Sequence, residues 1–274
     1  MNTKITPYKR IRPQIKDYSI IDTNAKLRRL ARKMMKVSEF AFDTETNTLR
    51  VNGENKDFLC VCITISWGAY DNYYIPLNHR REEDTHRNLL EEDVVDALQP
   101  VFDRDDVIVV GQNLKFDLHV LTRIGFTFKR TMQIYDTMLA LWICDENFSK
   151  GLKENSMRFF DYQQDHFADI VNSVPSEVKK EFGLKASNKA TYDLVLIEDG
   201  FSYALEDSFH TWNLYVMCLD RVENEGMTEI LHKHMFPFLW TLYRMEERGV
   251  EIDVEALKQM QVDMAEDLDS MLYD

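Results

Sequence analysis

The stretch that decides the fold is Glu39-Phe40-Ala41-Phe42-Asp43-Thr44-Glu45-Thr46, an apolar run that leads into two acids. The run predicts a short strand over residues 39–43. Residues two apart on a strand point to the same side, so Asp43 and Glu45 would present both carboxylates together at the strand end. Among 47 acidic residues such a pair also arises by chance, as a solvated strand end. The pair therefore indicates a functional site only if further acids elsewhere in the chain join it.

A second acid-bearing segment begins with a brief, fully apolar run. Val107–Val110 predicts a buried strand that breaks at Gly111-Gln112-Asn113. Asp117 then falls about one turn into a helix that starts near Leu114. Asn113 has two interpretations, either a substrate contact or a cap of that helix.

A third segment is helical. Tyr203 and Asp207 are four residues apart on a helix expected over residues 201–222, so they share a face. His210, one turn further, is interpreted as structural. Four carboxylates at one point repel one another strongly unless cations lie between them. Together the three segments therefore predict a two-metal site, a kind of site that cleaves phosphodiesters.

The composition is that of an ordinary globular protein. The 274 residues are 45% hydrophobic and 29% charged, which is enough apolar material for a core. No apolar run approaches the ~20 residues of a membrane span, and the N-terminus carries no secretory signal, so a cytoplasmic location is expected. The four cysteines lack zinc-like spacing and are expected to be free thiols. The net charge of −14 is unusual for a nucleic-acid binder.

The order of the expected elements favours an α/β fold, a mixed sheet with helices packed on it. Strands are expected at 39–43, 58–67, 70–77 and 107–110, and helices at 25–37, 87–102, 114 onward, 134–160 with a break near 146–150, 201–222, 232–248 and 254 onward. Gly249 is expected to stop one helix and Asp253 to cap the last. Residues 161–200 are expected to be variable and partly mobile. The basic residues between 26 and 36 face either a nucleic acid or solvent.

In this order the segments resemble the three motifs of the DEDD 3′–5′ exonuclease superfamily. More narrowly, they resemble the proofreading domain of family A, or DNA polymerase I-like, DNA polymerases. The matching residues are Asp43-Thr44-Glu45-Thr46 with Leu49, then Asn113-Leu114-Lys115-Phe116-Asp117, then Tyr203 with Asp207. The histidine subclass would place its histidine five residues before the last aspartate, where Ser202 stands. The match is therefore to the tyrosine subclass.

Two further stretches support the resemblance, which covers about residues 37–265. Tyr135–Ala140 followed by Gly151-Leu152-Lys153 is similar to the segment after the second motif, and residues 238–253 are similar to the junction between exonuclease and polymerase domains. The sequence contains none of the family's polymerase motifs, so the chain is not expected to polymerise DNA alone. The resemblance implies a ribonuclease H-like sheet flanked by helices, with a C-terminal helical extension. It divides the chain into an extended lead-in (1–22), an exonuclease domain (23–225) and a helical segment like the start of a polymerase domain (226–274).

The resemblance also implies roles for the site residues. The metal ligands and catalytic acids are Asp43, Glu45, Asp117 and Asp207, and Tyr203 orients the attacking water. Glu45 contacts either a metal or that water. The implied substrate contacts are Thr44, Leu49, Asn113, Lys115 and Phe116. Leu49, the family's wedge between terminal bases, could equally be a core leucine, and Lys115 a solvated lysine.

The implied activity is 3′–5′ exonucleolytic removal of 5′-mononucleotides from DNA, as in proofreading, with two divalent cations, Mg²⁺ or Mn²⁺. The implied partners are DNA with a single-stranded 3′ end and a DNA polymerase chain or domain, with no membrane involved. Two alternatives stay open. One is an exoribonuclease like RNase D, which the polymerase-like junction at 238–253 disfavours. The other is a module that binds nucleic acid or a polymerase without cleaving, which the four retained acids disfavour.

Overall fold

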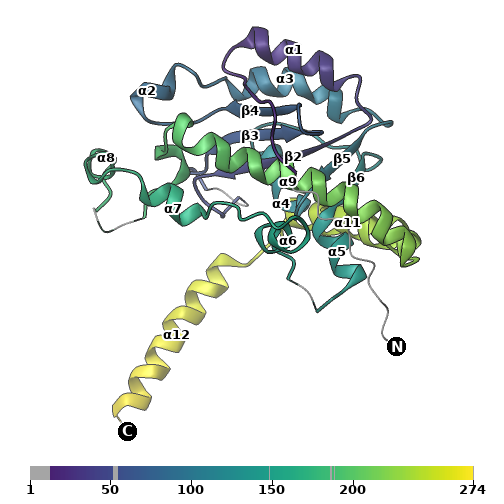
Figure 1. Ribbon diagram of the computed structural model, residues 1–274. Coiled ribbons are helices and arrows are strands. Elements are labelled where there is room, and N and C mark those ends of the chain that lie inside the picture. Colours follow the sequence, from purple (N-terminus) through teal and green to yellow (C-terminus); the bar gives the residue numbers. More distant parts are fainter. Residues whose placement is uncertain (1–12, 52–54, 148, 186, 188, 274) are drawn as a thin grey trace.

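The centre of the fold is one six-stranded mixed sheet (Figure 1). The computed structural model describes residues 13–51, 55–147, 149–185, 187 and 189–273. The strands are β1 (Ser19–Ile20), β2 (Glu39–Thr46), β3 (Cys60–Ser66), β4 (Asn72–Pro76), β5 (Ile108–Gly111) and β6 (Gln133–Asp136). Their order is β1-β4-β3-β2-β5-β6, in which β3 runs antiparallel to β2 and β4 and the other neighbours are parallel. The predicted α/β class is confirmed.

Helices cover both faces of this sheet (Figure 1). They are α1 (Asn24–Met34), α2 (Glu82–Thr85), α3 (Glu91–Phe102), α4 (Leu114–Arg123), α5 (Thr137–Cys144), α6 (Leu152–Phe160), α7 (Phe167–Asn172), α8 (Ser176–Glu181), α9 (Ile197–Asn224), α10 (Thr228–Ile230), α11 (Phe236–Arg248) and α12 (Val254–Tyr273), with a 3₁₀ turn η1 (Tyr192–Leu194) and a π-helical turn η2 (Leu231–Met235). The long α9 contacts β2, β3, β4 and β5. Helix α1 packs against α3, which covers the other face, so the basic residues of α1 lie on the side of the sheet away from α9.

The alternation of side chains along β2 sends its aromatic residues to one face and its acids to the other. Phe40 and Phe42 meet Phe102 of α3 edge-on, at ring-centroid distances of 5.6 and 5.8 Å. Asp43 and Glu45 therefore point to the opposite face, toward α9. Both phenylalanines of β2 are fully buried, and each contributes roughly 1.5–3 kcal/mol of apolar burial that a one-residue slip would lose. The apolar face of β2 thus fixes where its acids point.

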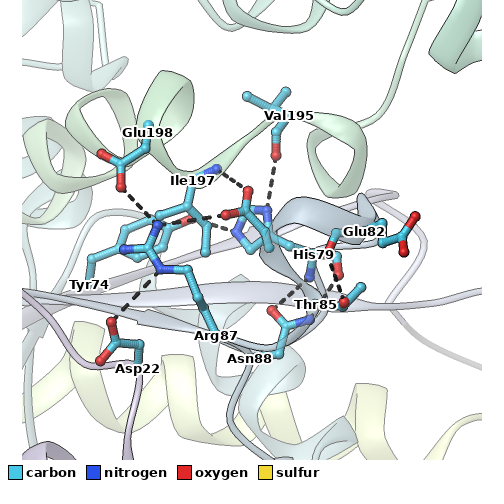
Figure 2. Close-up of polar contacts among 11 residues, drawn as sticks. Asp22, Tyr74, His79, Glu82, Thr85, Arg87, Asn88, Val195, Ile197 and Glu198 are labelled. Carbon is cyan, nitrogen blue, oxygen red and sulfur yellow. Dashed lines mark hydrogen bonds and ion pairs between the residues drawn. The ribbon is translucent and has the colours of Figure 1, made fainter.

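The first turn of α9 is held by residues far earlier in the chain. Leu196, at the N-cap position, is apolar, and the buried Asp84 instead accepts a 2.7 Å hydrogen bond from the backbone N–H of Ile197. Arg87 pairs with Glu198 at 2.8 Å beside this contact (Figure 2). A carboxylate at a helix N-terminus satisfies a free N–H group and interacts favourably with the helix dipole. These contacts fix the axial position of α9.

His79 anchors the chain just before α9. A carbonyl can only accept, so Nδ1 of His79 donates to the Val195 carbonyl at 3.0 Å, and Nε2 accepts from the Tyr74 hydroxyl at 2.8 Å (Figure 2). Burial lowers the pKa of His79, which keeps the ring neutral in this tautomer. Tyr203 lies about 9 Å along the helix from its first residue, so the position of Tyr203 depends on this anchor.

The predicted helix start at residue 134 differs from the structure. Residues 133–136 form the strand β6, not the start of a helix, because this short apolar run pairs with β5, and runs of that length do not distinguish strand from helix. Residues 161–200 contain α7, α8, η1 and the first turn of α9 where they are described, and Tyr192 and Val195 are buried there. The expected lead-in lies outside the described residues up to residue 12, and its remainder contributes β1.

The helix α11 is fastened to α4 through polar contacts. Lys115 pairs with Glu246, and the two ring nitrogens of His119 contact Glu246 and Glu247. The Tyr243 and Thr122 hydroxyls lie 2.6 Å apart on the same interface. The segment that resembles the start of a polymerase domain is thus packed directly on the helix that carries most of the second motif.

The last two helices end and begin as predicted. Gly249 has φ 66° and ends α11, and Asp253 accepts a 2.9 Å hydrogen bond from the N–H of Ala256 at the start of α12. Helix α12 extends away from the rest of the molecule (Figure 1). The four cysteines are free thiols, as predicted. Among the described residues no helix combines the length and the apolar character that a membrane span requires.

Candidate active site

Three of the four predicted acids lie together at the end of β2. One ligand oxygen from each of Asp43, Glu45 and Asp207 lies within 4.8 Å of the other two. Asp43 and Glu45 belong to β2 and Asp207 belongs to α9, so elements far apart in the sequence meet here. The three residues line a pocket of about 470 Å³.

Asp117 lines the same pocket but stands apart from that group of three. It is buried in the first turn of α4, where it accepts two hydrogen bonds from Thr44, from the backbone N–H at 3.1 Å and from the hydroxyl at 2.6 Å. Thr44 stands between Asp43 and Glu45 in β2. Thr44 therefore links Asp117 to the strand that carries two of the other acids. We call these four carboxylates the acidic site (Asp43, Glu45, Asp117 and Asp207).

Burial raises the pKa of all four acids, and repulsion from the other site acids adds to the rise for Asp43 and Glu45. For Asp43 burial is the largest cause, followed by the charges of Asp117, Asp207 and Glu45. For Glu45 burial again comes first, followed by the charge of Asp207. Burial raises the pKa of Asp117 to about 7, although the hydrogen bonds from Thr44 oppose the shift, and it raises the pKa of Asp207 to about 6. Positive charge nearby would favour the ionised form of these carboxylates, and divalent cations would supply that charge.

Tyr203 lies one helical turn before Asp207 and lines the pocket. Its ring packs near Phe167 and Tyr192, at centroid distances of 6.1 and 6.3 Å, and Nζ of Lys153 lies 4.3 Å from its centroid. Burial, and after it the charges of Glu45, Asp207 and Asp43, raises the pKa of Tyr203. The phenol therefore keeps its proton at neutral pH.

Asn113 precedes α4 in the left-handed conformation, with φ 59° and ψ 43°. In the described part of the chain its side chain makes no capping hydrogen bond. Asp136 caps α4 instead, accepting from the N–H groups of Asn113 at 3.2 Å and Leu114 at 2.9 Å. The cap interpretation of Asn113 is therefore wrong, because a side-chain cap needs an extended backbone at that position. Its side chain is left to line the pocket.

The other predicted substrate contacts divide into two groups. Leu49 is 84% exposed and lines the pocket, so the core-leucine interpretation is wrong. Phe116 and Thr44 also line the pocket. Lys115 does not, because its ammonium pairs with Glu246 of α11. The structure therefore brings four of these five residues, counting Asn113, to the pocket.

Four residues at this site were missed by sequence reasoning. Phe167 and Thr191 line the pocket. Gln164 is almost fully buried, and its Nε2 donates to Oδ1 of Asp207 at 2.9 Å. Lys153 reaches the Tyr203 ring from α6. Phe167, Thr191 and Gln164 lie in the polar, mixed segment 161–200, where no hydrophobic period distinguishes them. Lys153 lies in the Gly-Leu-Lys stretch, whose pattern gave no reason to single out the lysine.

His210, one turn after Asp207, lies in an aromatic surrounding. Its ring centroid is 4.6 Å from that of Tyr162 and 6.0 Å from that of Phe160. Burial lowers the pKa of His210 to about 4, so the ring stays neutral. These contacts agree with a structural role.

A mixed sheet that carries carboxylates on β2, α4 and α9 around one pocket defines the class of ribonuclease H-like exonucleases. Within that class, the family model described as 3′-5′ exonuclease matches residues 18–217. The chain therefore belongs to the 3′–5′ exonuclease domain family of DNA polymerase I-like proteins.

Similar curated proteins are DNA polymerases. The DNA polymerase of Escherichia phage T5 is 29% identical over 245 residues, which cover 85% of this chain and 26% of that protein. DNA polymerase I of Borreliella burgdorferi is 25% identical over 241 residues, which cover 88% of this chain and 24% of that protein. The chain thus spans about a quarter of the length of these relatives.

Similar solved structures share the fold. The POL domain of Pol1 from M. smegmatis, in complex with DNA primer-template and dNTP, has a TM-score of 0.62 at 16% identity and covers 90% of this chain and 35% of that one. Escherichia coli RNase D has a TM-score of 0.57 at 15% identity, covering 86% and 52%. Brucella melitensis NrnC with bound Mg²⁺ has a TM-score of 0.53 at 19% identity, covering 80% and 90%.

Proposed function

We propose that this chain hydrolyses DNA from its 3′ end, releasing 5′-mononucleotides with the help of two divalent cations. The observation that carries the proposal is the meeting of Asp43, Glu45 and Asp207 within 4.8 Å, with Asp117 bonded to the residue between the first two. DNA is favoured over RNA because the similar curated proteins are DNA polymerases. The domain division at residues 23–225 and 226–274 is part of the same proposal.

The acidic site suits hard divalent cations. Its donors are all carboxylate oxygens, the ligands that Mg²⁺ and Mn²⁺ prefer. The raised pKa values of Asp43 and Glu45 reflect burial first and repulsion by the other acids second, and bound cations would offset both. Asp43, Glu45, Asp117 and Asp207 would hold the ions, and the Mg²⁺ in the NrnC structure is consistent with this. When bound, such ions activate a water molecule and stabilise negative charge on the leaving 3′-oxygen.

The remaining steps belong to the chain's own side chains. Tyr203, which stays protonated, offers a hydroxyl that orients the attacking water, and Glu45 lies close enough to share that task. Leu49 and Phe167 are exposed by 84% and 40% at the pocket, where apolar side chains can contact the terminal base. The side chain of Asn113 does not cap α4, so it can make a polar contact with the same nucleotide. A DNA polymerase chain or domain is the expected partner.

The test is an exonuclease assay on DNA labelled at its 5′ end, with Mg²⁺ or Mn²⁺ present. We expect a ladder of shortened products from the wild-type protein. Asp43→Ala combined with Glu45→Ala should lower the rate by about a thousandfold or more, the size typical of catalytic groups that act as a unit. Far-UV circular dichroism should be unchanged, because both residues lie at the end of β2 and not in its apolar face.

A matched control replaces an acidic pair outside the site. Glu82→Ala with Glu83→Ala removes the same number of charges from the exposed face of α2 and should leave the rate unchanged. An RNA oligonucleotide of the same sequence, run in parallel, separates a deoxyribonuclease from an RNase D-like enzyme. A folded double variant at residues 43 and 45 that degrades DNA as fast as the wild type would refute the proposal.

A further inference from the structure

One cation stands beside the acidic site without belonging to any of the three motifs. Lys153, in the first turn of α6, places Nζ 4.3 Å from the centroid of the Tyr203 ring. The same Nζ donates to the carbonyl of Asp165, which fixes the ammonium in place. An ammonium has three donor hydrogens, so the bond to Asp165 leaves donor capacity for a ligand. The side chain is partly exposed and lies against Tyr203, which lines the pocket.

The charge of Lys153 acts on the acidic site. Burial is the largest influence on Asp43, Glu45 and Asp207 and raises the pKa of each. In each case the ammonium of Lys153 is the leading charge that opposes the rise. The geometry agrees, because Tyr203 lines the pocket together with Asp43, Glu45 and Asp207, and the ammonium of Lys153 lies over its ring.

A charge balance explains why such a cation is needed. Four ionised carboxylates are neutralised by two divalent cations, which leaves no net positive charge for the substrate. The phosphodiester brings one negative charge, and the attack of hydroxide adds another in the transition state. A fixed ammonium that faces this developing charge stabilises the transition state without needing to reorganise. It also offers a local attraction for DNA on a chain whose net charge is −14.

We propose that Lys153 is a substrate-binding residue whose ammonium, held over the Tyr203 ring, contacts the phosphate of the 3′-terminal nucleotide. This inference rests on the proposed function and adds a contact that none of the three motifs supplies. It predicts opposite effects on the binding of an anionic ligand and of a metal cation. Removal of the charge should weaken the binding of an anionic ligand and, because repulsion disappears, tighten the binding of a metal cation.

The experiment measures the binding of both ligands to the full chain with Lys153→Met, which removes the charge and keeps an unbranched side chain only one atom shorter. Free Mn²⁺ is followed by electron paramagnetic resonance, and thymidine 5′-monophosphate at saturating Mn²⁺ by calorimetry. We expect the nucleotide to bind about tenfold more weakly, as for the loss of one charge-assisted hydrogen bond. We expect Mn²⁺ to bind roughly three- to tenfold more tightly, as for the loss of one nearby like charge. Lys153→Arg, which keeps the charge, should leave Mn²⁺ affinity near that of the wild type.

Lys150→Met is the matched control. Lys150 also lies over an aromatic ring, with Nζ 5.4 Å from the centroid of Trp142, in the same part of the chain. Its replacement should change neither affinity. The inference is overturned if Lys153→Met weakens both ligands, as a merely structural residue would, or if it fails to shift them in opposite directions. A wild-type protein that binds both ligands but degrades no DNA would refute the proposed function, and the two affinities would still decide the role of Lys153.

Discussion

The acidic site and the segment that flanks it have different physical origins. The four acids stand on β2, α4 and α9, whose apolar faces fix the direction of each carboxylate. The flanking segment (residues 151–166) brings Lys153 to Tyr203 and Gln164 to Asp207, from α6 and the loop that follows it. Burial and repulsion oppose the ionisation of the acids when no cation is bound. The flanking segment partly offsets this effect through the ammonium of Lys153 and the amide of Gln164. The functional residues thus lie where buried carboxylates oppose folding unless cations are bound.

The same contrast explains why the acids can be recognised and the flanking residues cannot. Asp43 and Glu45 must be carboxylates two apart at the end of a strand, and a compact sequence motif records that requirement. Gln164 needs only to reach one oxygen of Asp207 from a turn, which many backbone paths allow. The predictions below test this contrast between the acidic site and the flanking segment, and they run from the largest expected effect to the smallest.

The largest effect is expected from the burial of ionisable carboxylates in the acidic site. In EDTA the folded protein should lose stability as the pH rises from about 4 to about 7, because Asp117 holds a proton up to a pKa of about 7 when folded but only to about 3.8 when unfolded. At about 1.4 kcal/mol per pKa unit, the loss is on the order of 4 kcal/mol. Mg²⁺ should restore stability, and more so at about pH 8 than at about pH 5, because protons no longer compete. Urea unfolding at both pH values with and without Mg²⁺ measures this.

The variant Asp117→Asn separates this effect from the general cost of the net charge. It keeps the side-chain shape and cannot ionise, so it should be more stable than the wild type in EDTA at the higher pH and less responsive to Mg²⁺. Equal pH profiles for the two proteins would show that the acids are not strained in the metal-free state.

An intermediate effect is expected where the flanking segment touches the acidic site. Gln164→Leu removes the amide that donates to Oδ1 of Asp207 and leaves that oxygen free to turn. Loss of such an orienting hydrogen bond typically costs 10- to 100-fold in metal affinity or activity. Mn²⁺ titration together with the exonuclease rate measures the loss. Gln163→Leu, at the neighbouring, less buried position, should leave both unchanged, and equal behaviour of the two variants would make the Gln164 contact incidental.

Much of the fold follows from the sequence for reasons that particular residues illustrate. Phe40 and Phe42 alternate with Ala41 and Asp43, and that period alone places β2 and the direction of its acids. The sequence pattern predicts helix where β6 lies, because four residues are too few to show a period. The convergence of Asp207 with β2 could be expected only through the resemblance, because no local pattern brings α9 across the sheet. Phe167 and Gln164 could not be predicted, since their positions depend on packing between α7, η1 and α9.

The smallest effect is expected from the anchor of α9, which supports the acidic site from a distance. Asp84→Ala removes the acceptor of the Ile197 N–H and should lower the free energy of unfolding by about 1–2 kcal/mol, as for loss of an N-cap. Asp84→Asn keeps an acceptor oxygen and should lose less, whereas the exposed neighbour Glu83→Ala should lose almost nothing. Urea unfolding ranks the three. Because Tyr203 and Asp207 lie further along the same helix, the exonuclease rate should fall only a few-fold with Asp84→Ala, less than with Gln164→Leu. A rate loss larger than that of Gln164→Leu would mean that the position of α9, and not the local hydrogen bond to Asp207, limits the geometry of the acids.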